Sequence, residues 1–171
     1  MATGITIAPP VTTKVVRIDK PGSQFTSITG TLSESKTGSI LIPAGTVTAG
    51  SLLELTARAS KTGTAGTLQM RIYINDAPDL TTPSILGSTP VMGATSLAGQ
   101  LQRTIDVLDS GTANIVRLSA SGAYTDATND TQSLQSVVTD WTIDQYIILA
   151  LTNGSTADSS VGAILALKIF K

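Results

Sequence analysis

Carboxylates are the side chains with which this chain could do acid–base chemistry, because it contains no histidine and no cysteine. That composition excludes Ser-His and Cys-His catalytic arrangements, disulfide bonds and the common His- and Cys-ligated metal sites. The two glutamates are Glu34 and Glu54, and Glu54 lies on the polar face of an alternating segment near Arg58. A solvated strand face with a cross-strand ion pair explains Glu54. The positions of the carboxylates in the sequence do not identify a facing pair such as a glycosidase uses. We therefore expect a protein that is not an enzyme and has no cofactor.

Aspartates gather in segments that we expect to be loops, where their oxygens could bind calcium. The candidates for such a site are Asp76, Asp79, Asp126 and Asp130. The chain lacks a calcium-binding loop closed by a glutamate. Aspartate is also a typical turn residue, because its side chain bonds the nearby backbone. The sequence therefore favours turn-forming roles for these residues and predicts no bound metal.

The charge pattern bears on partners and location. Lys and Arg total 11 against 12 Asp and Glu, a net charge of -1, and the basic residues are dispersed. This pattern is not that of a nucleic-acid-binding or polybasic membrane-surface protein. The N-terminus does not resemble a signal peptide, and the apolar stretches 146–151 and 161–167 are too short to cross a bilayer. We expect neither nucleic acid nor membrane as a partner, and synthesis in a cytoplasm.

Aromatic residues make up only 4% of the chain, a low share for a protein that stacks sugar rings on its surface. Trp141 lies in an alternating segment next to Ile143, so we expect it in the core. Tyr73 falls on the polar side of its segment and Tyr124 in a loop. These two tyrosines are the aromatic residues better placed to contact a ligand.

The elements that would position these residues are strands. The chain has 27 threonines and 18 serines, and β-branched residues favour strands over helices. Residues 52–60 alternate between apolar and polar side chains, and residues 67–74 do the same. A turn-rich segment, 61–66, lies between them. The pattern predicts a β-hairpin with one face toward water.

The last two predicted strands differ from the others. Residues 146–151 and 161–167 are apolar at nearly every position. Strands of this kind are buried on both faces. They are therefore either central strands of a sandwich or strands whose outer face is covered by a neighbouring subunit. Further strands are expected at 13–18, 40–42, 101–107, 115–120 and 136–143.

No segment shows a helical period and no linker divides the chain, so we expect an all-β protein. Eight or nine short strands are typical of a sandwich, a barrel or a jelly roll. Residues 1–30 are expected to form an extended N-terminal arm, because Pro9 and Pro10 favour an extended backbone. This arm is either a frayed terminus with one edge strand or a segment that docks on another subunit. Residues 31–171 are expected to form a single domain.

Four segments resemble jelly-roll proteins of tailed-bacteriophage virions. They are ILIPAGT at 40–46, GSLLELTARA at 50–59, KTGTAGT at 61–67 and WTIDQYIIL at 141–149, the last followed by a polar turn and an apolar strand. The resemblance extends over residues 38–171. It implies an antiparallel β-sandwich of jelly-roll type with about eight strands and an extended N-terminal arm.

In that family, such chains form head decorations, head fibres or tail appendages, commonly as homotrimers attached to the particle by an N-terminal arm. The resemblance therefore implies a virion location and partners such as the major capsid protein. It also implies that capsid-binding residues lie in the arm. We name Ile5, Ile7, Pro9, Pro10, Val15 and Val16 as these residues.

The alternative is a tail-fibre or receptor module that binds a host surface glycan. Its binding surface would consist of the loops 75–84, 121–131 and 153–160, since loops on a rigid scaffold commonly carry recognition. A cellular carbohydrate-binding module is a weaker alternative, because no catalytic domain or linker accompanies it in the sequence.

Overall fold

The computed structural model describes residues 15–20, 25–108, 112–118 and 134–171. Within these ranges the chain forms eleven strands and no helix, in agreement with the predicted all-β class. The described residues therefore contain no helix that could span a membrane. The strands are β1 (Val15–Lys20), β2 (Ile28–Thr29), β3 (Ser35–Ile42), β4 (Leu52–Thr62), β5 (Leu68–Asn75), β6 (Ser84–Ser88), β7 (Ala98–Val107), β8 (Thr112–Leu118), β9 (Leu134–Asp140), β10 (Gln145–Asn153) and β11 (Ser159–Phe170).

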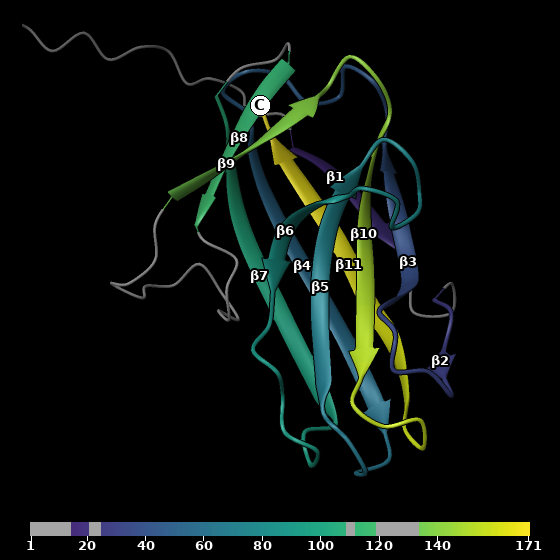
Figure 1. Cartoon of the computed structure of the whole chain (residues 1–171). Coiled ribbons are helices and arrows are strands. Elements are labelled where there is room, and N and C mark those ends of the chain that lie inside the picture. Colours follow the sequence, from purple (N-terminus) through teal and green to yellow (C-terminus); the bar gives the residue numbers. More distant parts are fainter. Residues whose placement is uncertain (1–14, 21–24, 109–111, 119–133) are drawn as a thin grey trace, which may run out of the picture.

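The strands form two antiparallel sheets that face each other (Figure 1). The larger sheet has seven strands in the order β1-β11-β4-β7-β8-β9, with β2 also paired to β11, and the smaller has four in the order β3-β10-β5-β6. This arrangement confirms the predicted antiparallel β-sandwich. There are more strands than the expected eight, partly because β2 and β6 are too short to show a clear alternation in the sequence.

The predicted hairpin of residues 52–60 and 67–74 is wrong. The first segment, β4, pairs with β11 and β7, whereas the second, β5, pairs with β10 and β6 in the opposite sheet. The short connection between them crosses from one sheet to the other (Figure 1). Alternation predicts which side chains face the core, but it does not identify the partner strand. Two strands that face each other across a core show the same alternation as two strands that pair.

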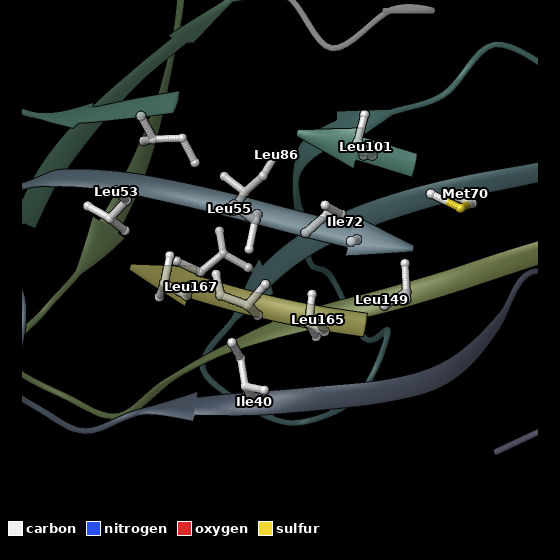
Figure 2. Packing of buried hydrophobic residues seen from close by; sticks show 14 of the residues in the cluster. Ile40, Leu53, Leu55, Met70, Ile72, Leu86, Leu101, Leu149, Leu165 and Leu167 are labelled. Carbon is white, nitrogen blue, oxygen red and sulfur yellow. The ribbon is translucent and has the colours of Figure 1, made fainter. Parts of the chain in front are cut away.

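The alternation itself predicts the core correctly. Leu53 and Leu55 of β4 and Ile72 of β5 are each at most 1% exposed, as are Leu165 and Leu167 of β11. Their side chains meet in the space between the sheets (Figure 2). Trp141 is also buried, as predicted, although it follows β9 rather than lying within it. Burial of this contiguous apolar surface is the main force holding the two sheets together.

The two-sided apolar strands are both central strands of their sheets. β10 lies between β3 and β5, and β11 lies between β1 and β4. In β10, Ile148 and Ala150 are fully buried although they lie outside the core cluster between the sheets. The chain therefore covers this part of the outer face of β10 itself. In β11, by contrast, Ile164 and Ala166 on the outer face stay partly exposed.

The range expected to be an arm, 1–30, includes two strands of the larger sheet. β1 pairs along its whole length with the end of β11, from Val15 opposite Phe170 to Lys20 opposite Leu165. β2 pairs with the start of β11. Edge-strand pairing at 15–20 agrees with the short strand expected at 13–18. The portion of the expected arm that precedes β1, residues 1–14, lies outside the described residues.

Candidate binding hollow

A hollow lies at one end of the sandwich, where four elements of the two sheets meet. β5 ends there at Asn75, β6 begins at Ser84, β9 ends at Asp140 and β10 begins at Gln145. The hollow has a volume of about 190 Å³. Its lining residues are Ile74, Asn75, Asp76, Thr82, Ser84, Val138, Thr139, Asp140, Ile143 and Gln145.

The connection between β5 and β6 forms one side of this hollow. Asp79 stabilises the connection as a turn residue, because its Oδ1 accepts a hydrogen bond of 2.8 Å from the backbone N–H of Thr81. Asn75 Nδ2 donates to the backbone oxygens of Asp79 and Thr81. Thr82 has a φ of 53°, which is unusual for a β-branched residue. These contacts hold the backbone of Asp76 and Thr82 at the rim of the hollow.

The turn between β9 and β10 forms the opposite side. Asp140 Oδ1 accepts hydrogen bonds from the hydroxyl of Thr142 (2.6 Å) and from its backbone N–H (2.8 Å). These two bonds lower the pKa of Asp140 below its ordinary value, because they favour the ionised carboxylate. Gln145 Nε2 donates to the backbone oxygen of Asp140 (2.8 Å), and Asp144 Oδ1 accepts from the backbone N–H of Ala44 (2.9 Å).

The hollow offers mainly hydrogen-bond acceptors and negative charge. Asp76 and Asp140 line it, and no described Lys or Arg does. Thr139 is only 5% exposed, and its buried Oγ1 has no hydrogen-bond partner. Val138 and Ile143 add an exposed aliphatic surface, being 67% and 45% exposed. The arrangement can bind a donor-rich or cationic group; within the described part of its lining, no nucleophile is paired with a base.

A buried ion pair lies at the opposite end of the sandwich. Lys61 Nζ is 3.3 Å from Asp158 Oδ2, and both side chains are at most 1% exposed. Lys61 also donates to the backbone oxygens of Gly66 and Ala94. Asp158 accepts from the backbone N–H groups of Ala65 (3.1 Å) and Gly66 (2.8 Å). Burial disfavours the charged carboxylate, but these amides and Lys61 outweigh it and lower the pKa of Asp158.

The sequence analysis did not single out this pair, although a signal for Lys61 was present. The inward positions of β4 include Leu53, Leu55, Ala57 and Ala59, and one further step of two reaches Lys61. We expected a loop from residue 61, whereas β4 continues to Thr62. An inward lysine requires a buried acceptor, but nothing in the local sequence identifies a residue almost a hundred positions later.

A second polar cluster covers the outer face of the smaller sheet. Arg71 Nη1 donates to Glu34 Oε1 (3.0 Å), and the Tyr73 hydroxyl donates to Glu34 Oε2 (2.8 Å). Arg71 Nη2 also donates to Gln69 Oε1 (2.8 Å). Burial and the bond to Glu34 raise the pKa of Tyr73 to about 12. The hydroxyl of Tyr73, one of the two tyrosines considered as candidate ligand contacts, is thus bonded within the chain.

Glu54 lies on the outer face of the larger sheet, as expected. It forms a cross-strand ion pair with Lys168 of β11, with 3.4 Å between Nζ and Oε2. Arg58 instead donates from Nε to Gln100 Oε1 (2.6 Å). These side chains surround a shallow depression of about 210 Å³, which Ile164 and Ala166 also line. Partly exposed ion pairs of this kind contribute little to stability.

The calcium candidates do not converge in the part of the chain that the structure describes. Asp76 lines the hollow, whereas Asp79 is engaged in its turn. Asp126 and Asp130, like Tyr124, lie outside the described residues. Across the described ranges, no group of three or more acidic side chains is placed to hold a metal ion.

The three loops proposed as one glycan-binding surface do not lie together. β10 runs antiparallel to β5, with Tyr146 opposite Asn75 and Asn153 opposite Leu68. The loop at 75–84 therefore lies at one end of the sandwich and the loop at 153–160 at the other (Figure 1). The loop at 121–131 lies outside the described residues. Of the two loops that the structure describes, loop 75–84 contributes to the hollow and loop 153–160 does not.

Of the predicted capsid-binding residues, Val15 and Val16 lie in β1, where their backbones pair with Phe170 and Ile169. The other four, Ile5, Ile7, Pro9 and Pro10, lie outside the described residues. The chain was also compared with known proteins: no protein-family model matches it, and neither does any curated protein.

Proposed function

We propose that this chain is a non-enzymatic structural protein of a tailed-bacteriophage virion, a capsid decoration or head-fibre subunit that assembles as a homotrimer. The observation that carries the proposal is the strand order. Without β2 and the β8–β9 hairpin, the sandwich has two four-stranded sheets, β1-β11-β4-β7 and β3-β10-β5-β6. Along the chain, β1, β3, β4 and β5 lie alternately in the larger and the smaller sheet, β6 stays in the smaller, and β7, β10 and β11 alternate again, as in the two interlocked Greek keys of a jelly roll. This order supports the jelly-roll resemblance seen in the sequence.

The position of β1 supports attachment of the chain to a capsid. β1 is an edge strand whose six residues all pair with β11. Residues 1–14 therefore start from a fixed point on the domain, and they include the predicted capsid-binding residues Ile5, Ile7, Pro9 and Pro10. In our proposal, this segment binds the major capsid protein and the sandwich faces outward.

We place the contact between subunits on the outer face of the larger sheet. The depression there presents the aliphatic side chains of Ile164 and Ala166, rimmed by the charged Glu54, Arg58 and Lys168. An apolar centre with a polar rim is the usual composition of a subunit interface. The outer face of β10 is less suitable, because Ile148 and Ala150 are already covered within the chain.

Two measurements test this proposal. Light scattering of the purified chain should give three times the chain mass of 17.5 kDa. Deletion of residues 1–14 spares every strand pair of β1, so the truncated chain should remain a trimer and keep its melting temperature but no longer co-sediment with capsids that lack the protein. A monomeric full-length chain, or capsid binding that survives the deletion, would contradict the proposal.

The alternative is a receptor module that binds a host surface glycan, and the hollow is the feature that favours it. Asp76, Asp140 and nearby hydroxyls could accept or donate hydrogen bonds to sugar hydroxyls. Among the described residues that line the hollow, however, none is aromatic, so these residues offer no ring for stacking. A glycan array distinguishes the two functions: binding that is lost on replacing Asp76 would favour the receptor module.

A further inference from the structure

The first strand begins at the same end of the sandwich as the hollow (Figure 1). Val15 of β1 pairs with Phe170 at the end of β11, and the row continues through Leu52 of β4 to Asp106 near the end of β7. β8 and β9 extend the larger sheet at this end, where Asp140 lines the hollow. We call it the hollow end. The opposite end, where β4 ends and β11 begins, we call the capped end.

We infer that the hollow end of the sandwich faces the capsid and that the capped end is the outermost surface of the particle. The inference rests on the proposed function, because it takes the capsid to be the partner of residues 1–14. It adds the orientation of the domain on that partner. The connections at the capped end, which face away from the capsid in this orientation, are 63–67, 89–97 and 154–158.

The positions of Pro9 and Pro10 limit how far the proposed capsid contacts can lie from the domain. These residues lie six and five positions before Val15, so even a fully extended backbone carries them at most about 20 Å from the start of β1. The 12 residues of β11 run from the capped end to the hollow end over roughly 36 Å. Contacts at Pro9 and Pro10 can therefore extend beyond the hollow end, but they cannot reach the capped end.

The capped end is closed by contacts within the chain. Lys61 Nζ donates to the backbone oxygens of Gly66 and Ala94 and lies 3.3 Å from Asp158 Oδ2. These three acceptors belong to the β4–β5, β6–β7 and β10–β11 connections, so one buried ammonium group ties the three together. Connections held in this way open rarely, and proteases cut segments that open. Such an end suits the exposed surface of a particle.

Exposed aliphatic side chains do not by themselves distinguish the two ends. Val91 and Leu97 are exposed at the capped end, and Val138 and Ile143 are exposed at the hollow end. The observation that selects the hollow end is the place where β1 begins.

The test uses single thiols, because the chain contains no cysteine. Ala49→Cys places a thiol at the hollow end, in the β3–β4 connection, and Thr95→Cys places one at the capped end, in the β6–β7 connection. Both residues are exposed. Each full-length variant is bound to capsids that lack the protein and treated with a maleimide that carries polyethylene glycol. Attachment slows the chain in a denaturing gel, and the rate is compared with that of the same variant free in solution.

On the capsid, labelling of Ala49→Cys should slow at least roughly tenfold and that of Thr95→Cys less than about twofold, because a packed interface excludes a bulky reagent. Ile143→Cys and Thr64→Cys, exposed at the hollow and the capped end, repeat the comparison at independent positions. A full-length chain that does not co-sediment with capsids would overturn the proposed function and the orientation with it. A chain that binds but is labelled equally at both ends, or is protected only at the capped end, would overturn the orientation alone.

Discussion

At the scale of single residues, the described polar side chains mostly have their partners within the chain. Glu34 receives both Arg71 and Tyr73 on the outer face of the smaller sheet. Lys61 and Asp158 pair where the connection between β4 and β5 crosses from sheet to sheet. The Glu34 cluster and the Lys61–Asp158 pair each link segments that are distant in sequence. Asp76 and Asp140 at the hollow differ, because neither takes part in any of the described ion pairs.

The Glu34 cluster leads to a prediction about alkaline pH. Because the pKa of Tyr73 is raised to about 12 from the ordinary value of 10.0, the protonated phenol contributes stability that is fully present below pH 10. This contribution is lost as the pH rises through about 12. Replacing Glu34 by Gln removes the negative charge, so the pKa of Tyr73 should fall partway toward 10, with burial accounting for the remaining shift.

An ultraviolet titration of the tyrosines measures this change. Tyr73→Phe identifies the Tyr73 component, because it removes that signal and leaves those of Tyr124 and Tyr146. A Glu34→Gln chain in which the pKa of Tyr73 is unchanged would show that burial alone sets the value.

At the scale of elements, the connection between β4 and β5 decides the architecture, because it sends two consecutive strands into opposite sheets. The connection is packed closely against the one between β10 and β11. A Cβ atom at Gly66 would lie 2.4 Å from the backbone carbonyl carbon of Gly154 and 2.4 Å from the backbone nitrogen of Ser155. Backbone atoms on both sides leave no space for a side chain.

We therefore predict that Gly66→Ala destabilises the fold by about 1–3 kcal/mol, the range typical of overpacking. The matched control is Gly93→Ala, since a Cβ atom there would meet nothing within 4 Å. Its effect should stay within about 0.5 kcal/mol, as for other surface substitutions. Chemical denaturation of the three proteins measures both effects. An equal free energy of unfolding for Gly66→Ala and Gly93→Ala would contradict the prediction, because the β4–β5 and β10–β11 connections would then have moved apart at no cost in stability.

At the scale of the whole molecule, the two sheets differ in what their outer faces leave exposed. On the outer face of the smaller sheet, Ile148 and Ala150 are completely buried. On the outer face of the larger sheet, Ile164 is partly exposed in the depression. If this depression is the subunit contact that we propose, a positive charge at position 164 must weaken the assembly, because it would lose its hydration and lie directly opposite the like charge of Arg58 on the neighbouring strand.

Ile164→Lys should accordingly convert a trimer to monomers at micromolar concentration, as measured by light scattering, with the sandwich still folded by circular dichroism. Gln102→Lys is the control, because Gln102 is exposed on β7 of the same sheet but does not line the depression. This variant should remain trimeric. A trimer that persists in Ile164→Lys would place the contact on another face.

The sequence by itself determined the all-β class, the inward and outward positions along β4, β5 and β7, and the exclusion of histidine and cysteine chemistry. These properties are local: a strand repeats every two residues, so a few neighbours suffice to orient it. The burial of Trp141 could also be predicted in this way.

Only the tertiary structure decided which strands pair and which side chains meet. The alternation of residues 52–60 and 67–74 is compatible with a hairpin and with two facing sheets, and long-range pairing with β11 and β10 selects the second. The hollow has the same origin. Asp76 and Asp140 are far apart in sequence, and they line one space because the end of β5 meets the end of β9. Contacts of that range depend on the packing of the whole sandwich, which no local pattern encodes.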